Sequence, residues 1–247
     1  MTQDMGTALD HENQGVQVEK PAKKVETKKP AKNLYEPYST PRICWEIIRV
    51  ILHIIFFITM RIRLRGRYNL PRKGPYIIAA NHLSWLDIPL VPTFVPQKVI
   101  FMAKEELFHG KVGWLVRFLG AFPVKRGEGD RQAIRAADEQ LKQNKIFMIF
   151  PEGTRSKTCT MAKGNPGLGM IALRAGVPVV PVAIWGSEHG LKKFGAPITI
   201  SYGEPLILKP KGTKITREDI QEGTDEVMKR IAAMLPARYR GVYGEQE

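Results

Sequence analysis

The hydrophobic positions of this chain fall into short runs separated by polar stretches with a helical period. Six apolar runs predict strands, at residues 76–80, 99–103, 121–124, 146–150, 179–184 and 198–202. Between two of these runs, residues 129–144 place Ile134 and Leu141 on one side of a predicted helix. A further helix is expected from Thr216, because Asp219 follows three positions later in a capping-box-like start.

The fold class follows from this alternation of strands and helices and from the length. We expect a single α/β domain in which helices cover a largely parallel or mixed sheet. A chain of 247 residues suffices for one sizeable core, but not for two full domains and a tail. This domain is predicted to span residues 66–247.

Residues 41–65 predict a helical segment that associates with a membrane, because they contain the strongest hydrophobic run, residues 43–60. Four polar residues interrupt this run at helical spacing: Arg42, Glu46, Arg49 and His53. A spanning helix needs roughly twenty mainly apolar residues, and a central charge costs roughly 2.5 to 3.5 kcal/mol. The pattern therefore favours an amphipathic helix lying in the interface, with its polar stripe at the headgroups or docked on the domain. A buried core helix with a satisfied polar edge is the alternative.

The net charge predicts an anionic partner. Residues 1–40 have no apolar period and predict a disordered tail. Their six Lys are balanced by six Asp plus Glu, so the formal charge of +14 belongs to the rest of the chain, and the isoelectric point of the whole sequence is near 9.8. Near anionic lipid, each arginine after the apolar run contributes about 1 kcal/mol to the free energy of membrane binding. These arginines are Arg61, Arg63, Arg65 and Arg67. We therefore expect a monotopic or peripheral protein at the cytoplasmic face of the cell membrane.

Nucleic acid is the other partner that a strongly basic chain suits. The cations are not interleaved with an aromatic stacking platform, and no predicted helix reads as a recognition element, so we expect no nucleic-acid binding. Cys44 and Cys159 lie far apart in the sequence, without a Cys/His cluster around either. Neither a disulfide framework nor a metal site is therefore expected, and a reducing compartment is predicted.

Candidate chemistry lies in two segments about seventy residues apart, NHLSWLD at residues 81–87 and FPEGTRS at residues 150–156. Each follows a predicted strand, where reactive side chains commonly emerge. In the first segment, a neutral His82 can act as a general base if Asp87 holds its tautomer. The two side chains would meet across the start of a helix that begins near residue 84 or 85. Taken alone, such a pair is more often structural than catalytic.

Three cations are expected near strand ends. Arg155 follows a turn whose glycine lets the backbone approach a ligand, and Lys125 and Arg126 follow the predicted strand at residues 121–124. Because arginine offers planar, paired donors to phosphate, the three cations would outline a phosphate pocket. The alternative is that all three are ordinary solvated surface charges.

Four blocks of the sequence together resemble one family. The blocks are NHxSxxD at residues 81–87, a glycine with a short apolar stretch and basic residues at 120–126, FPEGTRS at 150–156 and a VPVVPVAI strand at 177–184. In this order they are similar to the 1-acylglycerol-3-phosphate O-acyltransferases, also called lysophosphatidic acid acyltransferases, of the glycerolipid acyltransferase group. The resemblance covers roughly residues 65–205.

The resemblance implies an enzyme of phospholipid biosynthesis. It would transfer an acyl group directly from acyl-acyl carrier protein (acyl-ACP) or acyl-coenzyme A (acyl-CoA) to the sn-2 hydroxyl of lysophosphatidic acid, giving phosphatidic acid. Neither a cofactor, a metal nor a covalent acyl-enzyme is expected. One alternative is a related acyltransferase with another acceptor, such as glycerol 3-phosphate, a lyso-ornithine lipid or a glycolipid. Another is a non-catalytic protein that binds anionic membranes.

The resemblance also implies roles for the site residues. His82 would take the hydroxyl proton, and Asp87 would orient His82 and balance its charge. The acceptor phosphate would be held by three cations: Lys125, Arg126 and Arg155. The oxyanion needs donors too, for which the backbone amides around Gly153 and Thr154 or the Lys125 ammonium are candidates. Glu152 would either bind the acceptor or order the turn.

Overall fold

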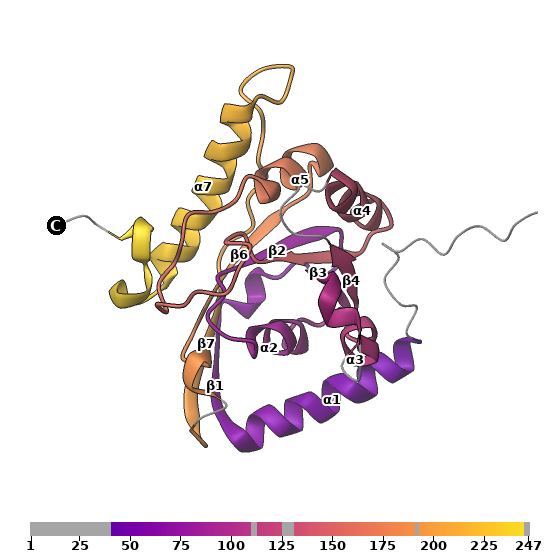
Figure 1. Cartoon of the computed structure of the whole chain (residues 1–247), viewed down its shortest axis with the longest axis vertical. Helices are drawn as coiled ribbons and strands as arrows, with labels where there is room; N and C mark the ends of the chain where they lie inside the picture. The colour runs from indigo at the N-terminus through magenta and orange to yellow at the C-terminus, as the bar shows by residue number, and fades with distance from the viewer. Residues whose placement is uncertain (1–40, 110–112, 125–130, 191–192, 245–247) are drawn as a thin grey trace, which may run out of the picture. The chain divides into compact units, whose positions relative to one another are not determined.

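A mixed sheet of seven strands lies at the centre of the computed structural model, which describes residues 41–109, 113–124, 131–190 and 193–244 (Figure 1). The strands are β1 (Met60–Arg65), β2 (Tyr76–Ala80), β3 (Val99–Lys104), β4 (Ala121–Val124), β5 (Ile146–Ile149), β6 (Val179–Trp185) and β7 (Ala196–Tyr202). They lie in the order β1-β7-β6-β2-β5-β3-β4, and all neighbours are parallel except the antiparallel pair β6 and β7. The expected α/β fold with a mixed sheet is confirmed. The tail expected at residues 1–40 lies outside the described residues.

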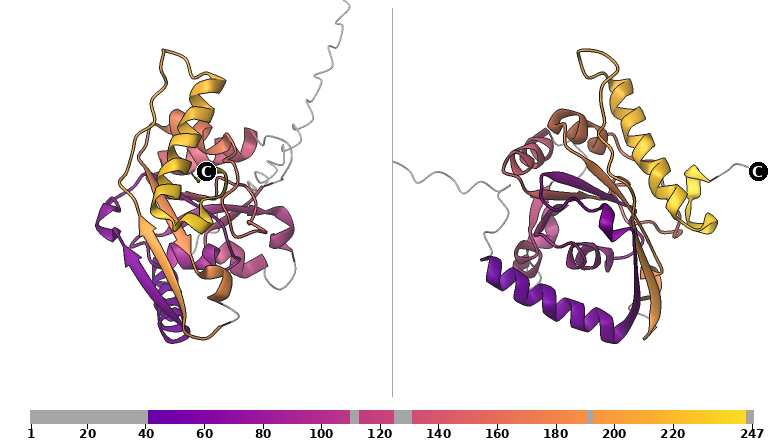
Figure 2. Two further views of the ribbon diagram at one scale, coloured as in Figure 1. Left: turned by 90° about the vertical axis from the view of Figure 1, so that its left-hand side faces the viewer. Right: turned by 180° about the vertical axis from the view of Figure 1, so that it is seen from behind.

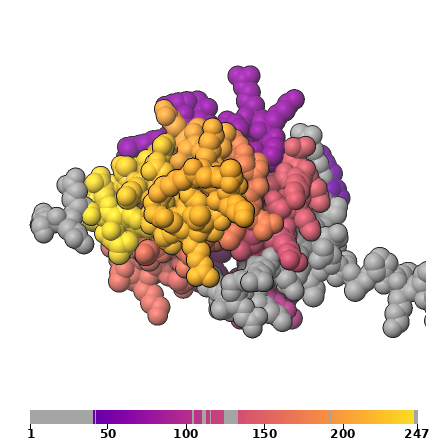
Figure 3. Space-filling model, turned by 90° about the horizontal axis from the view of Figure 1, so that it is seen from above, coloured from indigo at the N-terminus to yellow at the C-terminus, as the bar shows by residue number. Residues whose placement is uncertain are grey.

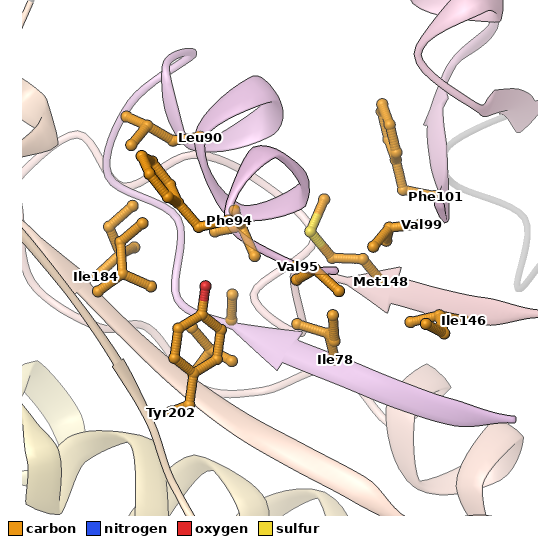
Figure 4. Packing of buried hydrophobic residues seen from close by; sticks show 14 of the residues in the cluster. Ile78, Leu90, Phe94, Val95, Val99, Phe101, Ile146, Met148, Ile184 and Tyr202 are labelled. Atoms are coloured by element: carbon orange, nitrogen blue, oxygen red, sulfur yellow. The ribbon is translucent and has the colours of Figure 1, made fainter. Parts of the chain in front are cut away.

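Helices cover both faces of this sheet (Figures 1 and 2). The helices in the described residues are α1 (Arg42–Thr59), α2 (Asp87–Thr93), α3 (Gly113–Phe118), α4 (Arg131–Lys142), α5 (Gly167–Ala175), α6 (Ser187–Gly190) and α7 (Arg217–Met234). One face of the sheet packs against α1 and α2 around residues such as Leu90 and Phe94 (Figure 4). The other face packs against α4, α5 and α7 around residues such as Ile171 and Val227. Because both faces are covered, the central strand β2 is buried at every position.

The C-terminal helix begins as the sequence predicted. The Thr216 side chain accepts a hydrogen bond from the backbone N–H of Asp219 at 3.1 Å, and the Asp219 carboxylate accepts one from the backbone N–H of Thr216 at 2.9 Å. This reciprocal pair satisfies two donors that a helix start leaves free. Helix α7 then packs Val227 and Ile231 against the sheet. Together with neighbouring C-terminal residues (orange to yellow), α7 forms much of the surface seen from above (Figure 3).

Helix α1 has two unlike sides. Its inner side buries Trp45 and Phe56 and carries His53, whose ring lies 4.7 Å from the Phe94 ring. Glu46 forms an ion pair of 2.7 Å with Arg49 on the same helix. The outer side exposes a row of large apolar residues: Ile43, Ile47, Val50, Ile51, Ile54, Ile55, Phe57 and Ile58. His53 of the polar stripe therefore contacts the domain, and the exposed apolar row on the outer side argues against a buried core helix. In the part of the chain that the structure describes, no helix is both long and apolar enough to cross a bilayer.

The prediction of a helical segment at residues 41–65 is wrong for residues 60–65. Helix α1 ends at Thr59, and β1 follows directly as an edge strand paired in parallel with β7. The physical reason is a period of two, since arginines at exposed positions alternate with Ile62 and Leu64, which pack on the core. The folded domain therefore begins before residue 66.

Candidate active site

The candidate residues lie in two loops at the carboxyl ends of the central strands. Because β2 and β5 are parallel neighbours, the loops that follow them leave the sheet at the same end. The backbone N–H of Ser156 donates a hydrogen bond to the His82 carbonyl at 2.8 Å and joins the two loops. The Asn81 side chain exchanges two hydrogen bonds with the backbone of Ile184 in β6, at 2.9 and 2.8 Å. The first loop is thus anchored to β6 on one side of β2 and to the loop that follows β5 on the other.

The carboxylate of Asp87 organises the first loop. Its Oδ2 atom accepts hydrogen bonds from His82 Nδ1 at 2.9 Å and from the backbone N–H groups of Leu83 and Ser84, each at 2.7 Å. The expected meeting of His82 and Asp87 therefore occurs. The expected helix start near residue 84 or 85 is wrong, because Asp87 itself begins α2 and its carboxylate holds the preceding amides in a non-helical loop.

The imidazole of His82 is fixed at one nitrogen and on one face. Asp87 binds Nδ1, and the ring of Phe150 stacks on the imidazole with centroids 4.0 Å apart and planes inclined by 17°. Because a carboxylate only accepts hydrogen bonds, Nδ1 carries the proton of the neutral ring and Nε2 is left as an acceptor. His82 is 6% exposed and lines a cavity of about 450 Å³. A hydrogen-bond acceptor in a cavity wall is what general-base chemistry requires.

The cavity combines apolar and cationic surface. Ile88, Phe101 and Leu168 contribute apolar side chains to its wall. Arg155 and Lys157 also line it, and both are solvent-exposed, so the cations lie where the cavity opens to solvent. Such a site suits a ligand with a long apolar part and an anionic head.

Glu152 binds backbone groups and does not line the cavity. Its Oε1 atom accepts a hydrogen bond from the backbone N–H of His82 at 3.0 Å, and Oε2 accepts one from Ala162 at 2.9 Å. Burial raises the pKa of the Glu152 carboxyl group, while the two backbone hydrogen bonds and the His82 imidazole act in the opposite direction. Both oxygens are engaged, and the residue is 4% exposed. Of the two roles left open for Glu152, these contacts favour ordering of the turn.

Gly153, Thr154 and Arg155 form an exposed turn that lines the cavity. Gly153 has a φ of 69°, a left-handed conformation that favours glycine. Its N–H donates a hydrogen bond to the Phe150 carbonyl at 2.9 Å, so this amide is engaged within the turn. The Arg155 guanidinium lies over the Trp85 indole, 4.9 Å from the ring centroid.

The structure adds cavity residues that the sequence did not single out. Among them are Trp85, Lys157 and Asn165. Trp85 lies within the first motif and Lys157 directly follows the second, which was their only available signal, and no sequence signal pointed to Asn165. The predicted phosphate ligands Lys125 and Arg126 lie outside the described residues. Within the ranges described, no group of three or more His, Cys, Asp or Glu side chains is arranged to hold a metal ion.

Known proteins are similar to this chain in sequence and in fold. The family model described as Acyltransferase matches residues 61–185. A 1-acyl-sn-glycerol-3-phosphate acyltransferase of Bacillus subtilis is 30% identical over 193 residues, which cover 77% of this chain and 94% of that protein. A lyso-ornithine lipid O-acyltransferase of Pseudomonas aeruginosa is 34% identical over 155 residues, 62% of this chain and 57% of that protein. The crystal structure of PlsC from Thermotoga maritima, a 1-acyl-sn-glycerophosphate (LPA) acyltransferase, has a TM-score of 0.60 at 32% identity and covers 76% of this chain and 79% of that one.

These matches include the candidate site. The family match at residues 61–185 runs from β1 to β6 and contains both loops. The Bacillus relative is matched over nearly its whole length. The chain therefore belongs to the acyltransferase family and is an enzyme, as its four sequence blocks indicated.

Proposed function

We propose that this enzyme transfers an acyl group from acyl-CoA or acyl-ACP to the sn-2 hydroxyl of lysophosphatidic acid, giving phosphatidic acid for phospholipid biosynthesis. The observation that carries the proposal is the His82–Asp87 pair at a cavity with apolar walls and exposed cations. The activities named for the Bacillus and Thermotoga relatives support lysophosphatidic acid as the acceptor.

The reaction is a direct transfer. The acceptor hydroxyl gives its proton to Nε2 of His82 while its oxygen attacks the carbonyl carbon of the thioester. The new ester C–O bond forms, the C–S bond breaks, and the departing thiolate takes the proton from the imidazolium. Asp87 stabilises the imidazolium through the hydrogen bond at Nδ1. The acyl donor is the co-substrate, and the mechanism uses no further cofactor, no metal and no acyl-enzyme.

The acceptor phosphate binds where the cavity opens to solvent. Arg155 contributes paired donors there, and the turn of Gly153 and Thr154 presents it. Lys125 and Arg126, which follow β4, are proposed as further phosphate ligands. The apolar wall of the cavity contacts an acyl chain.

A second acceptor is supported by one observation. The lyso-ornithine lipid O-acyltransferase of Pseudomonas aeruginosa is 34% identical to this chain over the matched residues, against 30% for the Bacillus relative. The same His82 chemistry would then act on a lipid whose headgroup carries no phosphate. The functional assay therefore compares lysophosphatidic acid with a lyso-ornithine lipid as the acceptor.

We further propose that α1 holds the enzyme at the cytoplasmic face of an anionic membrane as a monotopic or peripheral protein. Its outer side exposes apolar residues such as Ile54 and Phe57, which would enter the acyl boundary. Exposed arginines of β1, among them Arg61, follow directly and would meet the headgroups. An enzyme with amphiphilic substrates gains access to them in this position.

Replacement of the proposed base tests the reaction. His82→Ala is expected to lower the rate of phosphatidic acid formation by about 10²- to 10⁴-fold, because no other group takes the hydroxyl proton. The rate is measured with purified protein in liposomes, from each acyl donor and either lysophosphatidic acid or a lyso-ornithine lipid. His189→Ala is the control, since that side chain is 63% exposed and does not line the cavity. A folded His82→Ala enzyme with the native rate would contradict the proposal.

Glu152→Gln distinguishes ordering of the turn from binding of the acceptor. The new NH2 group would face a backbone N–H, so the free energy of unfolding is expected to fall by about 1 to 3 kcal/mol. We expect kcat to fall as His82 loses its support, while KM for the acceptor stays near the native value. Denaturant unfolding and steady-state kinetics measure these effects, with the exposed Glu204→Gln as the control. A stable variant that changes only the acceptor KM would instead make Glu152 an acceptor ligand.

The membrane role of α1 is tested by polar substitutions on its outer side. The double variant Ile54→Ser with Phe57→Ser is expected to weaken binding to anionic vesicles by about tenfold or more, because it removes apolar surface that enters the bilayer. Vesicle co-sedimentation gives the partition coefficient. Val242→Ser, at an exposed apolar residue outside α1, is the control. Unchanged partitioning of the double variant would show that another surface binds the membrane.

A further inference from the structure

Trp85 departs from the burial pattern of the first loop. The neighbouring Leu83, Leu86 and Asp87 are buried, whereas Trp85 is 50% exposed and lines the cavity. The backbone around it is ordered, because the Ser84 hydroxyl accepts a hydrogen bond from the backbone N–H of Leu86 at 3.2 Å. A rigid turn thus presents a large aromatic side chain at the opening of the cavity.

The Trp85 indole contacts the side chain of Arg155. The guanidinium carbon lies 4.9 Å from the centroid of the Trp85 ring, within the distance of about 6 Å over which an aromatic face attracts a cation. Among the described residues, no carboxylate forms an ion pair with Arg155. A guanidinium held over an aromatic ring by this attraction retains N–H donors for other partners, and these donors match a phosphate.

We propose that Trp85 is a positioning residue that holds the Arg155 guanidinium ready for the anionic headgroup of the acceptor. The inference rests on the proposed function, in which Arg155 binds the acceptor phosphate. A free arginine side chain loses rotamer freedom when it binds a ligand. Stacking on Trp85 restricts Arg155 before the acceptor arrives, and this lowers the cost of binding.

The two loops also connect the Trp85–Arg155 contact to the proposed base, His82. Trp85 lies between His82 and Asp87 in the loop that the Asp87 carboxylate orders. Arg155 is followed by Ser156, whose backbone N–H binds the His82 carbonyl. Hydrogen bonds within and between the two loops therefore hold the backbone around the base, Trp85 and Arg155 together. The NHxSxxD pattern leaves the position of Trp85 open, so the pattern itself does not imply this contact.

A double-mutant cycle tests the inference, with KM for lysophosphatidic acid, KM for the acyl donor and kcat measured for each variant. Trp85→Leu is expected to raise the acceptor KM by about three- to tenfold, with the donor KM and kcat close to native values. Trp85→Phe keeps an aromatic face and is expected to restore most of the affinity. In an Arg155→Ala background, Trp85→Leu is expected to change the acceptor KM no further, because it acts through Arg155. Thermal unfolding midpoints verify that each variant is folded.

The outcomes separate the inference from the proposed function. If Trp85→Leu raises the acceptor KM equally with and without Arg155, the indole contacts the acceptor itself and the positioning role is overturned. If Arg155→Ala raises the acceptor KM but Trp85→Leu leaves it unchanged, the positioning role is also overturned while the phosphate role of Arg155 stands. An Arg155→Ala enzyme with the native acceptor KM would overturn both.

Discussion

The hydrogen bonds that Asp87 Oδ2 accepts are the interaction on which the candidate site depends. This one oxygen binds His82 Nδ1 and two backbone N–H groups, and Asp87 has no solvent exposure. Among the described residues Oδ1 has no hydrogen-bond partner, so the three bonds to Oδ2 alone compensate the buried carboxylate for lost water, and they fix both the imidazole and the backbone around it. Helix α2 also begins at Asp87, where a helix N-terminus favours negative charge. Asp87 therefore contributes to the orientation of the base, the course of the loop and the start of the helix.

The second loop completes the site through bonds to the first. Glu152 binds the backbone N–H of His82, and Ser156 binds its carbonyl, so the backbone of the base is held on both sides. The Phe150 ring covers one face of the imidazole. In contrast to these buried contacts, the exposed side chain of Arg155 lies where the cavity meets solvent. A rigid base beside an accessible cation is the arrangement expected of an acyltransferase whose acceptor carries a hydroxyl near an anionic group.

Sequence reasoning succeeded where the interaction is local. The His82–Asp87 pair and the cap of α7 at Thr216 each join residues that are close in sequence, so their spacing predicted both contacts, although the helix start assumed for the first is wrong. The engagement of Glu152 depends on amides in two distant segments, and no local pattern connects them. The stacking of Phe150 on the imidazole arises only because β2 and β5 are neighbours in the sheet. Strand β1 was missed for another reason: its arginines alternate visibly with apolar residues, but they were interpreted as lipid contacts that follow a helix.

The tautomer of His82 in the resting enzyme tests the central claim most directly. Nitrogen-15 spectra of protein labelled at its five histidines distinguish protonated from unprotonated ring nitrogens, and a His82→Gln spectrum assigns the signals. The Asp87 hydrogen bond predicts that the neutral ring carries its proton on Nδ1 and leaves Nε2 unprotonated. A neutral His82 with its proton on Nε2 would have no acceptor for the substrate hydroxyl, and would contradict its assignment as the general base.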